Sequence, residues 1–189
     1  MTITKSNQKA YLVLDDGRIF EGNPWGCLGR TFGEAVFATG MTGYQETLTD
    51  PSYHKQVVVM TAPHIGNTGW NLEDNESNQI WVSGFVVRNP SPITSNWRSK
   101  TDLESELKRQ NIVGISGVDT RALTRHLRDR GAMRVGIFSG EDLSREEMVV
   151  EVRKFEQMSG SFLAKDVSTP NSYVVNAKEV RFKVVALDL

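Results

Sequence analysis

The amino-acid sequence predicts a mixed α/β fold, and three observations support this prediction. Short segments rich in β-branched and aromatic residues, which favour strands, dominate the first half of the chain. Apolar residues spaced three or four apart, which indicate amphipathic helices, begin after residue 100. A further strand candidate lies among these helical segments, at residues 133–139. Strands first and helices interleaved later are typical of a layered fold of sheet and helix.

The first half contains a predicted β-hairpin and three further strand candidates. An Asp-Asp-Gly sequence at residues 15–17 separates residues 10–14 from residues 18–21, and Asp-Gly is a strong turn signal between paired strands. The further candidates span residues 34–39, 56–61 and 80–87. The connection 63–78 is rich in Gly, Asn, Asp and Glu and has no apolar period. A long connection of this kind is typically functional or mobile.

The stretch 41–53 carries the densest set of turn signals and hydroxyl groups in the chain. Thr42, with Gln45 three residues later, predicts the capping box of a short helix. An Asp-Pro pair at residues 50–51 ends that helix, because the residue before a proline is pushed out of the α region. Ser52 then lies on a tight turn, where loop side chains are available to a ligand.

Three helices are predicted in the second half, each opened by a capping signal. Capping boxes at residues 101–104 and 144–147 open the first and the third. Asp119 or Thr120 caps the second, which ends at Gly131. The apolar side chains expected to face the core are Leu103, Leu107, Val118, Ala122, Leu123, Leu127, Met148, Val152 and Phe155.

Composition limits the classes of protein to which the chain can belong. The 189 residues suffice for one domain, or for one domain and part of another. With 22 Lys and Arg against 23 Asp and Glu, no overall field favours nucleic acid or an anionic membrane. A single cysteine excludes an internal disulfide and a cysteine-rich zinc site. Residues 1–9 are polar, which predicts a flexible N-terminus without a signal peptide, and a cytoplasmic location is expected.

Reactive residues outside residues 41–53 have plain structural interpretations. Cys27 has no histidine near it in the sequence, so a small buried apolar role is favoured over a nucleophilic one. The three histidines, His54, His64 and His126, have no paired spacing, so no metal site is predicted. Among them, His64 is the best functional candidate. The Gly-rich segments 22–29 and 66–69 match neither a phosphate-binding loop nor a dinucleotide fingerprint.

One helix face and three tryptophans are candidates for contact with a partner. Arg121, Arg125 and Arg128 fall on one face of the second helix, which is either solvated or an electropositive surface for an acidic partner. The candidate interface anchors are Trp70, Trp81 and Trp97, although a place in the core is favoured for Trp81, inside a strand pattern.

Several blocks, in order along nearly the whole chain, resemble one known family. They are residues 37–46 (FATGMTGYQE), 49–53 (TDPSY), 63–67 (PHIGN), 111–121 (NIVGISGVDTR), 123–125 (LTR) and 183–189 (KVVALDL). Together they resemble the small subunit of glutamine-dependent carbamoyl-phosphate synthetase. The resemblance implies a three-layer β/β/α swivelling domain over residues 10–168 and a linker over residues 169–179. Residues 180–189 are then the first strand of a glutamine amidotransferase domain, at which this chain is expected to be truncated.

The resemblance also implies a function. In the family, the small subunit releases ammonia from glutamine, and the large subunit uses it with ATP and Mg²⁺ to make carbamoyl phosphate for arginine and pyrimidine biosynthesis. The two subunits form a heterodimer of the ligase class. The catalytic Cys, His and Glu belong to the amidotransferase domain, so no catalytic residue and no cofactor are expected here. The expected roles are docking to the large subunit and a glutamine contact from Ser52, which matches the serine of the family's Asp-Pro-Ser-Tyr motif.

Two alternatives remain open from the residues alone. A stand-alone, non-catalytic binding or scaffold module has the same fold, with residues 180–189 completing its own sheet. A serine hydrolase requires Ser52 to act with His54 or His64, but the Gly-x-Ser-x-Gly elbow that exposes such a nucleophile is missing from the sequence.

Overall fold

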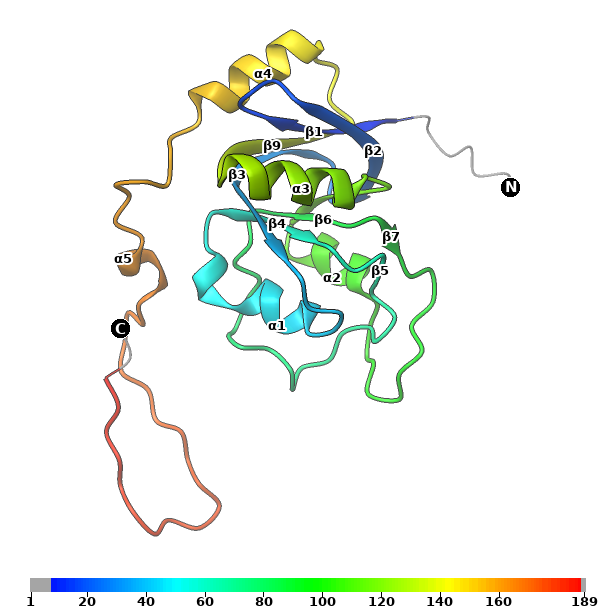
Figure 1. The fold of residues 1–189 in the computed structure, drawn as a ribbon. Helices are drawn as coiled ribbons and strands as arrows, with labels where there is room; N and C mark the ends of the chain where they lie inside the picture. Colours follow the sequence, from blue (N-terminus) through cyan, green and yellow to red (C-terminus); the bar gives the residue numbers. More distant parts are fainter. Residues whose placement is uncertain (1–7, 188–189) are drawn as a thin grey trace.

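The computed structural model describes residues 8–187 and has a mixed α/β fold built around a closed β-barrel (Figure 1). The barrel strands are β1 (Ala10–Leu14), β2 (Ile19–Gly26), β3 (Gly29–Ala38), β4 (Gln56–Met60), β6 (Gly84–Val86), β8 (Val113–Ser116) and β9 (Met133–Ser139). Around the barrel they follow the order β1-β2-β8-β6-β4-β3-β9. Two two-residue strands, β5 (His64–Ile65) and β7 (Asn89–Pro90), pair with each other outside the barrel.

The barrel contains a parallel half and an antiparallel half. Strands β3, β4, β6 and β8 are parallel neighbours, whereas β1, β2 and β9 pair in the antiparallel sense with each other or with β3 and β8. The helical segments are α1 (Tyr44–Thr49), the 3₁₀ turn η1 (Pro51–Tyr53), α2 (Leu103–Arg109), α3 (Thr120–Arg130), α4 (Arg145–Lys154) and α5 (Ala164–Val167). The predicted α/β class is therefore confirmed, whereas the specific three-layer swivelling arrangement stays a prediction.

Strand β4 illustrates why the barrel strands are so apolar. Alternate residues of each barrel strand point inward, and their side chains form the cluster that fills the barrel. Val57 and Val59 belong to this cluster. Val58 and Met60 point the other way, into a second cluster shared with α1 and α2. Because both faces are covered, an uninterrupted apolar run is stable here, and the predicted strand at residues 56–61 is confirmed.

The helices cover the outside and one end of the barrel. Leu123 and Leu127 of α3 belong to the same cluster as the barrel interior, so α3 packs directly against it. The second cluster includes Leu103 and Leu107 of α2, and a third places Met148 and Val152 of α4 against β1 and β9. Figure 1 shows α3 lying across the barrel strands, with α1 and α2 on one side and α4 on the other.

The predicted helix caps are confirmed for α3 and α4 and wrong for α2. Asp119 caps α3, and Ser144 forms a capping box with Glu147 in α4. In α2 the cap is Asp102, whose carboxylate accepts a hydrogen bond from the Ser105 amide at 2.8 Å. Thr101 is not the cap because its backbone pairs with Trp70 in an isolated bridge.

The predicted capping box at Thr42 is also wrong. Helix α1 begins after Gly43, whose φ of 80° lies in the left-handed region, and no side chain caps it. Gln45 does not turn back toward the helix start, because its amide group bonds the separate loop at residues 71–75.

Several strand predictions differ from the structure: β2 extends beyond the predicted residues 18–21 to Gly26, and β3 begins at Gly29, before the predicted residues 34–39. The candidate at residues 80–87 is shortened to β6, and β8 had no counterpart among the predicted strands. At the C-terminal end, residues 182–187 form no strand and their apolar side chains are exposed, Val185 by 97%. A strand needs a hydrogen-bonding neighbour, and residues 8–187 provide none for this segment. Residues 1–7 of the predicted flexible N-terminus, and residues 188–189, lie outside the described part of the chain.

Gly33 in β3 provides a test of the packing between the barrel and the turn that follows η1. A Cβ atom at Gly33 would lie 2.5 Å from the backbone oxygen of Lys55, which accepts a hydrogen bond from Glu34. Gly33→Ala is therefore expected to lower the free energy of unfolding by about 1–3 kcal/mol, as overpacking does in cores. Urea denaturation measures the change, and a loss below about 0.5 kcal/mol would show that the turn yields without strain.

Candidate functional site

The turn that carries Ser52 is fixed by its own backbone. Helix α1 ends at Thr49, and the next residue, Asp50, has an extended ψ of 119°, the conformation favoured before a proline. The Asp50 carboxylate accepts a hydrogen bond from the Ser52 amide at 2.8 Å, and the Asp50 carbonyl accepts one from Tyr53 at 3.1 Å. The predicted end of the helix and tight turn are thus confirmed, with η1 as the turn.

The Ser52 side chain is exposed, and its hydroxyl has no hydrogen-bond partner among residues 8–187. A serine hydroxyl can donate one hydrogen bond and accept others, so this group is free to contact a ligand. The turn therefore presents the Ser52 hydroxyl on a backbone that two hydrogen bonds to Asp50 hold in place.

The two histidines proposed as bases for Ser52 are placed differently. The ring of His54 packs edge-on against Trp81, with 5.4 Å between centroids, and its Nε2 lies 3.5 Å from a carboxylate oxygen of Asp166 in α5. His64 lies on β5, and neither ring bonds the Ser52 hydroxyl. The contact between nucleophile and base that a serine hydrolase needs is not made in the described residues.

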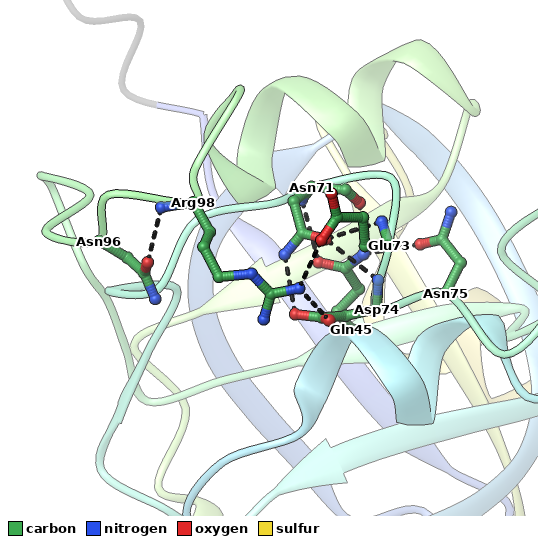
Figure 2. A network of polar contacts seen from close by, with 7 residues as sticks. All are labelled: Gln45, Asn71, Glu73, Asp74, Asn75, Asn96 and Arg98. Atoms are coloured by element: carbon green, nitrogen blue, oxygen red, sulfur yellow. Dashed lines mark hydrogen bonds and ion pairs between the residues drawn. The ribbon is translucent and has the colours of Figure 1, made fainter.

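A polar network ties the loop after β5 to helix α1 (Figure 2). The side-chain Nε2 of Gln45 donates a hydrogen bond to the backbone carbonyl of Asn71 at 2.5 Å, and its Oε1 accepts one from the backbone N–H of Asn71 at 3.2 Å. The Asn71 side chain donates to the Asp74 carboxylate at 2.8 Å. Arg98, from a second loop, reaches Asp74 at 2.6 Å and Glu73 at 3.1 Å. The first loop is thereby bonded to helix α1, and the second loop is joined to the first through Arg98.

These two segments, residues 65–79 and 91–101, are called here the paired loops. Backbone hydrogen bonds join them at Ser91 to Ile65, at Ser95 to Asn67, and in both directions between Trp70 and Thr101. The predicted long connection at residues 63–78 is therefore held in place by the neighbouring loop, within the part of the chain that the structure describes.

The paired loops expose large apolar side chains while burying others. Trp97 is 91% exposed, and Leu72 and Ile93 are 83% and 73% exposed. Trp70, by contrast, lies in the core. The prediction that Trp70 is an interface anchor is therefore wrong. Of the three tryptophans proposed as anchors, only Trp97 is fully on the surface. Trp81, partly buried, donates a hydrogen bond to the Ser77 hydroxyl at 2.8 Å.

The ion pair in the paired loops predicts a dependence on pH. Hydrogen bonds from Asn71 and Arg98 hold the pKa of the Asp74 carboxyl below its ordinary value of 3.8, and hydrogen bonding to Asp74 raises the pKa of Arg98. A carboxyl with a lowered folded pKa contributes stability above its unfolded pKa, and the contribution is lost as the pH falls through the folded value. The heteronuclear NOE of residues 71–79 should therefore be high near neutral pH, and it should decrease when the pH is lowered past about 4.

Asp74→Asn is the matched variant for this prediction. It removes the titrating group, so the NOE of residues 71–79 should be lower at neutral pH and should lose the acid transition. Glu104→Gln, which alters an exposed ion pair within α2, is the control and should leave the transition unchanged. Persistence of the transition in Asp74→Asn would assign it to another carboxyl.

Cys27 and the histidines form no reactive centre in residues 8–187. The half-buried Cys27 thiol donates to the Lys108 carbonyl at 3.5 Å and packs against the barrel cluster. No group of three His, Cys, Asp or Glu side chains is arranged to hold a metal ion in the described residues. None of the helices there is long and apolar enough to cross a membrane.

Comparison with known proteins decides the family. The model of the carbamoyl-phosphate synthase small chain, CPSase domain, matches residues 12–137, from the first barrel strand into the last. The chain belongs to the carbamoyl-phosphate synthase small-chain family. This match confirms the predicted resemblance, and it covers most of the barrel, the Ser52 turn and the paired loops.

Curated members of the small-chain family are similar over almost the whole chain. The carbamoyl phosphate synthase small chain of Streptomyces coelicolor is 65% identical over 182 residues, 95% of this chain and 48% of that protein. That of Mycolicibacterium paratuberculosis is 60% identical over 185 residues, 96% of this chain and 50% of that protein. The Mycobacterium tuberculosis H37Rv protein is 57% identical over 188 residues. The chain therefore spans about half the length of the curated relatives it matches.

The sequence did not predict the polar network of the paired loops, which joins Gln45, Asn71, Asp74 and Arg98. The sequence identifies residues 71–75 only as part of a loop without an apolar period. Nothing local connects it to Arg98, which lies 24 residues from Asp74 in the chain. The one available signal is the density of Asn and Asp, which favour side-chain hydrogen bonds to nearby backbone.

Proposed function

We propose that this chain is the N-terminal half of the small chain of a glutamine-dependent carbamoyl-phosphate synthase. The observation that carries the proposal is 65% identity to the Streptomyces coelicolor small chain over 95% of this chain. In the complete enzyme, an amidotransferase domain of the small chain releases ammonia from glutamine. The large chain then uses this ammonia, with ATP and Mg²⁺, in the synthesis of carbamoyl phosphate. The present half has a non-catalytic, docking role in this heterodimer.

Docking to the large chain occurs through the paired loops. Their exposed Leu72, Ile93 and Trp97 supply the apolar and aromatic surface that interface cores use. The hydrogen bonds and ion pairs that hold these loops reduce the conformational entropy lost on binding. This combination of rigid backbone and exposed apolar side chains supports a protein interface.

The C-terminal segment connects this half to the amidotransferase domain. We assign residues 10–168 to the domain, residues 169–179 to the linker and, in a complete small chain, residues 180–189 to the first strand of the amidotransferase sheet. The exposed apolar side chains of Phe182 and Val184 support this assignment, because such a run is stable only when another element covers it. The three-layer swivelling fold and the cytoplasmic location belong to the same proposal.

Calorimetric titration of the 189-residue chain with a carbamoyl-phosphate synthase large chain tests the docking role. Saturable binding is expected, and the same sample is expected to hydrolyse no glutamine. Absence of binding would contradict docking by this half and favour a stand-alone module of the same fold. Glutaminase activity in the sample would overturn the division of roles between the two halves.

The second role is a contact between Ser52 and glutamine across the domain boundary. In a complete small chain bound to its large chain, Ser52→Ala should raise KM for glutamine about 2- to 10-fold with little change in kcat, as the loss of one hydrogen bond would. Ser159→Ala, at another exposed serine, is the control and should leave KM unchanged. An unchanged KM in Ser52→Ala would remove Ser52 from the glutamine pocket.

A further inference from the structure

A hollow in the described residues lies where three parallel strands end. Strands β4, β6 and β8 are adjacent and run in the same direction, so their carboxyl ends meet at one edge of the barrel. Thr61 follows the end of β4, Arg88 follows β6, and Thr120 begins α3 after β8; all three line the hollow. In α/β sheets, ligands bind preferentially at the carboxyl ends of parallel strands.

The hollow is lined by four arginines and by no acidic side chain. Its lining consists of Thr61, Pro63, Arg88, Thr120, Arg121, Thr124, Arg125 and Arg128, around a volume of about 620 Å³. Arg121, Arg125 and Arg128, which share one face of α3, thus line a cavity together with Arg88. Arg88 lies 33 residues before Arg121 in the sequence. A volume of this size is typical of a site for a small molecule.

The positive charge of the hollow is compensated by ion pairs at only two of its four arginines among the described residues. Arg121 and Arg125 are exposed and make no ion pair with a described residue. Arg88 lies 3.6 Å from the Asp119 carboxylate, and Arg128 lies 3.6 Å from that of Asp129. Because like charges gathered on one surface oppose folding, an arrangement of this kind is stabilised when an anion occupies it.

We infer that this hollow binds a small molecule carrying two or more phosphate groups. The guanidinium group forms paired hydrogen bonds to phosphate oxygens, and four such groups match a polyanion better than a single carboxylate. Thr124, on the lining, has a buried hydroxyl without a hydrogen-bond partner in residues 8–187. No aromatic side chain lines the hollow, so the site recognises the phosphate chain and not a stacked base.

Titration of the 189-residue chain with pyrophosphate, at constant ionic strength, tests this inference. Saturable binding with one site is expected by calorimetry, together with a rise in Tm and amide shift changes at the α3 face and at Arg88. Arg121→Gln and Arg125→Gln should each weaken binding at least about tenfold. Without pyrophosphate, both variants should melt at the same temperature as the wild type or higher, because they remove repulsion.

Arg145→Gln is the matched control, an exposed arginine at the start of α4 and outside the hollow. It should change pyrophosphate affinity less than twofold, and sulfate at equal ionic strength should bind more weakly than pyrophosphate. Absence of saturable binding, or equal weakening by Arg145→Gln, would overturn the inference. If the wild type does not bind pyrophosphate but Arg125→Gln weakens its affinity for a large chain, the inference is overturned. The hollow would then be a contact surface for an acidic protein. The inference and its test do not depend on the proposed docking role.

Discussion

Replacing Phe85 by alanine is expected to lower the free energy of unfolding by about 3–5 kcal/mol, the range measured for large-to-small aromatic substitutions in cores. Phe85 is fully buried on β6, and its ring stacks on Trp25 of β2 with 5.8 Å between centroids. The two strands are not neighbours, since β8 lies between them. Gly114 of β8 is in register with both aromatic residues, and its missing side chain lets the rings meet across it.

Removal of the Phe85 ring therefore affects more than one pair of strands. The backbone at Gly114 cannot close over the space, because it is fixed in the barrel ladder on both sides. The second cluster, which carries α1 and α2 on the barrel, loses a central member. Urea denaturation of the 189-residue chain measures the effect. Phe37→Ala, at an aromatic residue 37% exposed on β3, is the control and should cost less than about 1.5 kcal/mol.

Sequence reasoning predicted best those elements whose signals are local. The hairpin at residues 15–17, the Asp119 cap and the Ser144 capping box each depend on residues within a few positions of one another, and all three form as predicted. The cap of α2 failed for the opposite reason. Thr101 has the right residue type, but a backbone bridge to Trp70 engages it, and no local pattern contains that contact.

The same distinction applies to the candidate sites. The Ser52 turn follows from an adjacent Asp-Pro pair, so the sequence alone predicted it. Strand β8 was missed because its four residues, two of them not apolar, are too few to show a period. The arginine-lined hollow was also missed, because Arg88 joins the α3 stripe only when the barrel brings the ends of β6 and β8 together. Closure of the barrel is a non-local event that short motifs do not encode.

Replacing Trp97 by serine is expected to weaken binding to the large chain at least about 30-fold, the equivalent of a hot-spot loss of about 2 kcal/mol or more. Trp97 is 91% exposed, so it contributes little to the isolated domain and can lose most of its exposed surface to a partner. Its neighbour Arg98 is held by Asp74 and Glu73, which fixes the backbone that presents the ring. Calorimetric titration with the large chain measures the change.

Stability and binding should separate in this variant. Because the Trp97 side chain is exposed, Trp97→Ser should leave Tm within about 2 °C of the wild type, whereas a change at buried Trp70 would unfold the paired loops themselves. Phe162→Ser removes an aromatic ring that is 79% exposed between α4 and α5, and it should leave the affinity unchanged. Equal weakening by both variants would indicate a general loss of apolar surface, and an unchanged affinity in Trp97→Ser would place the large-chain interface outside the paired loops.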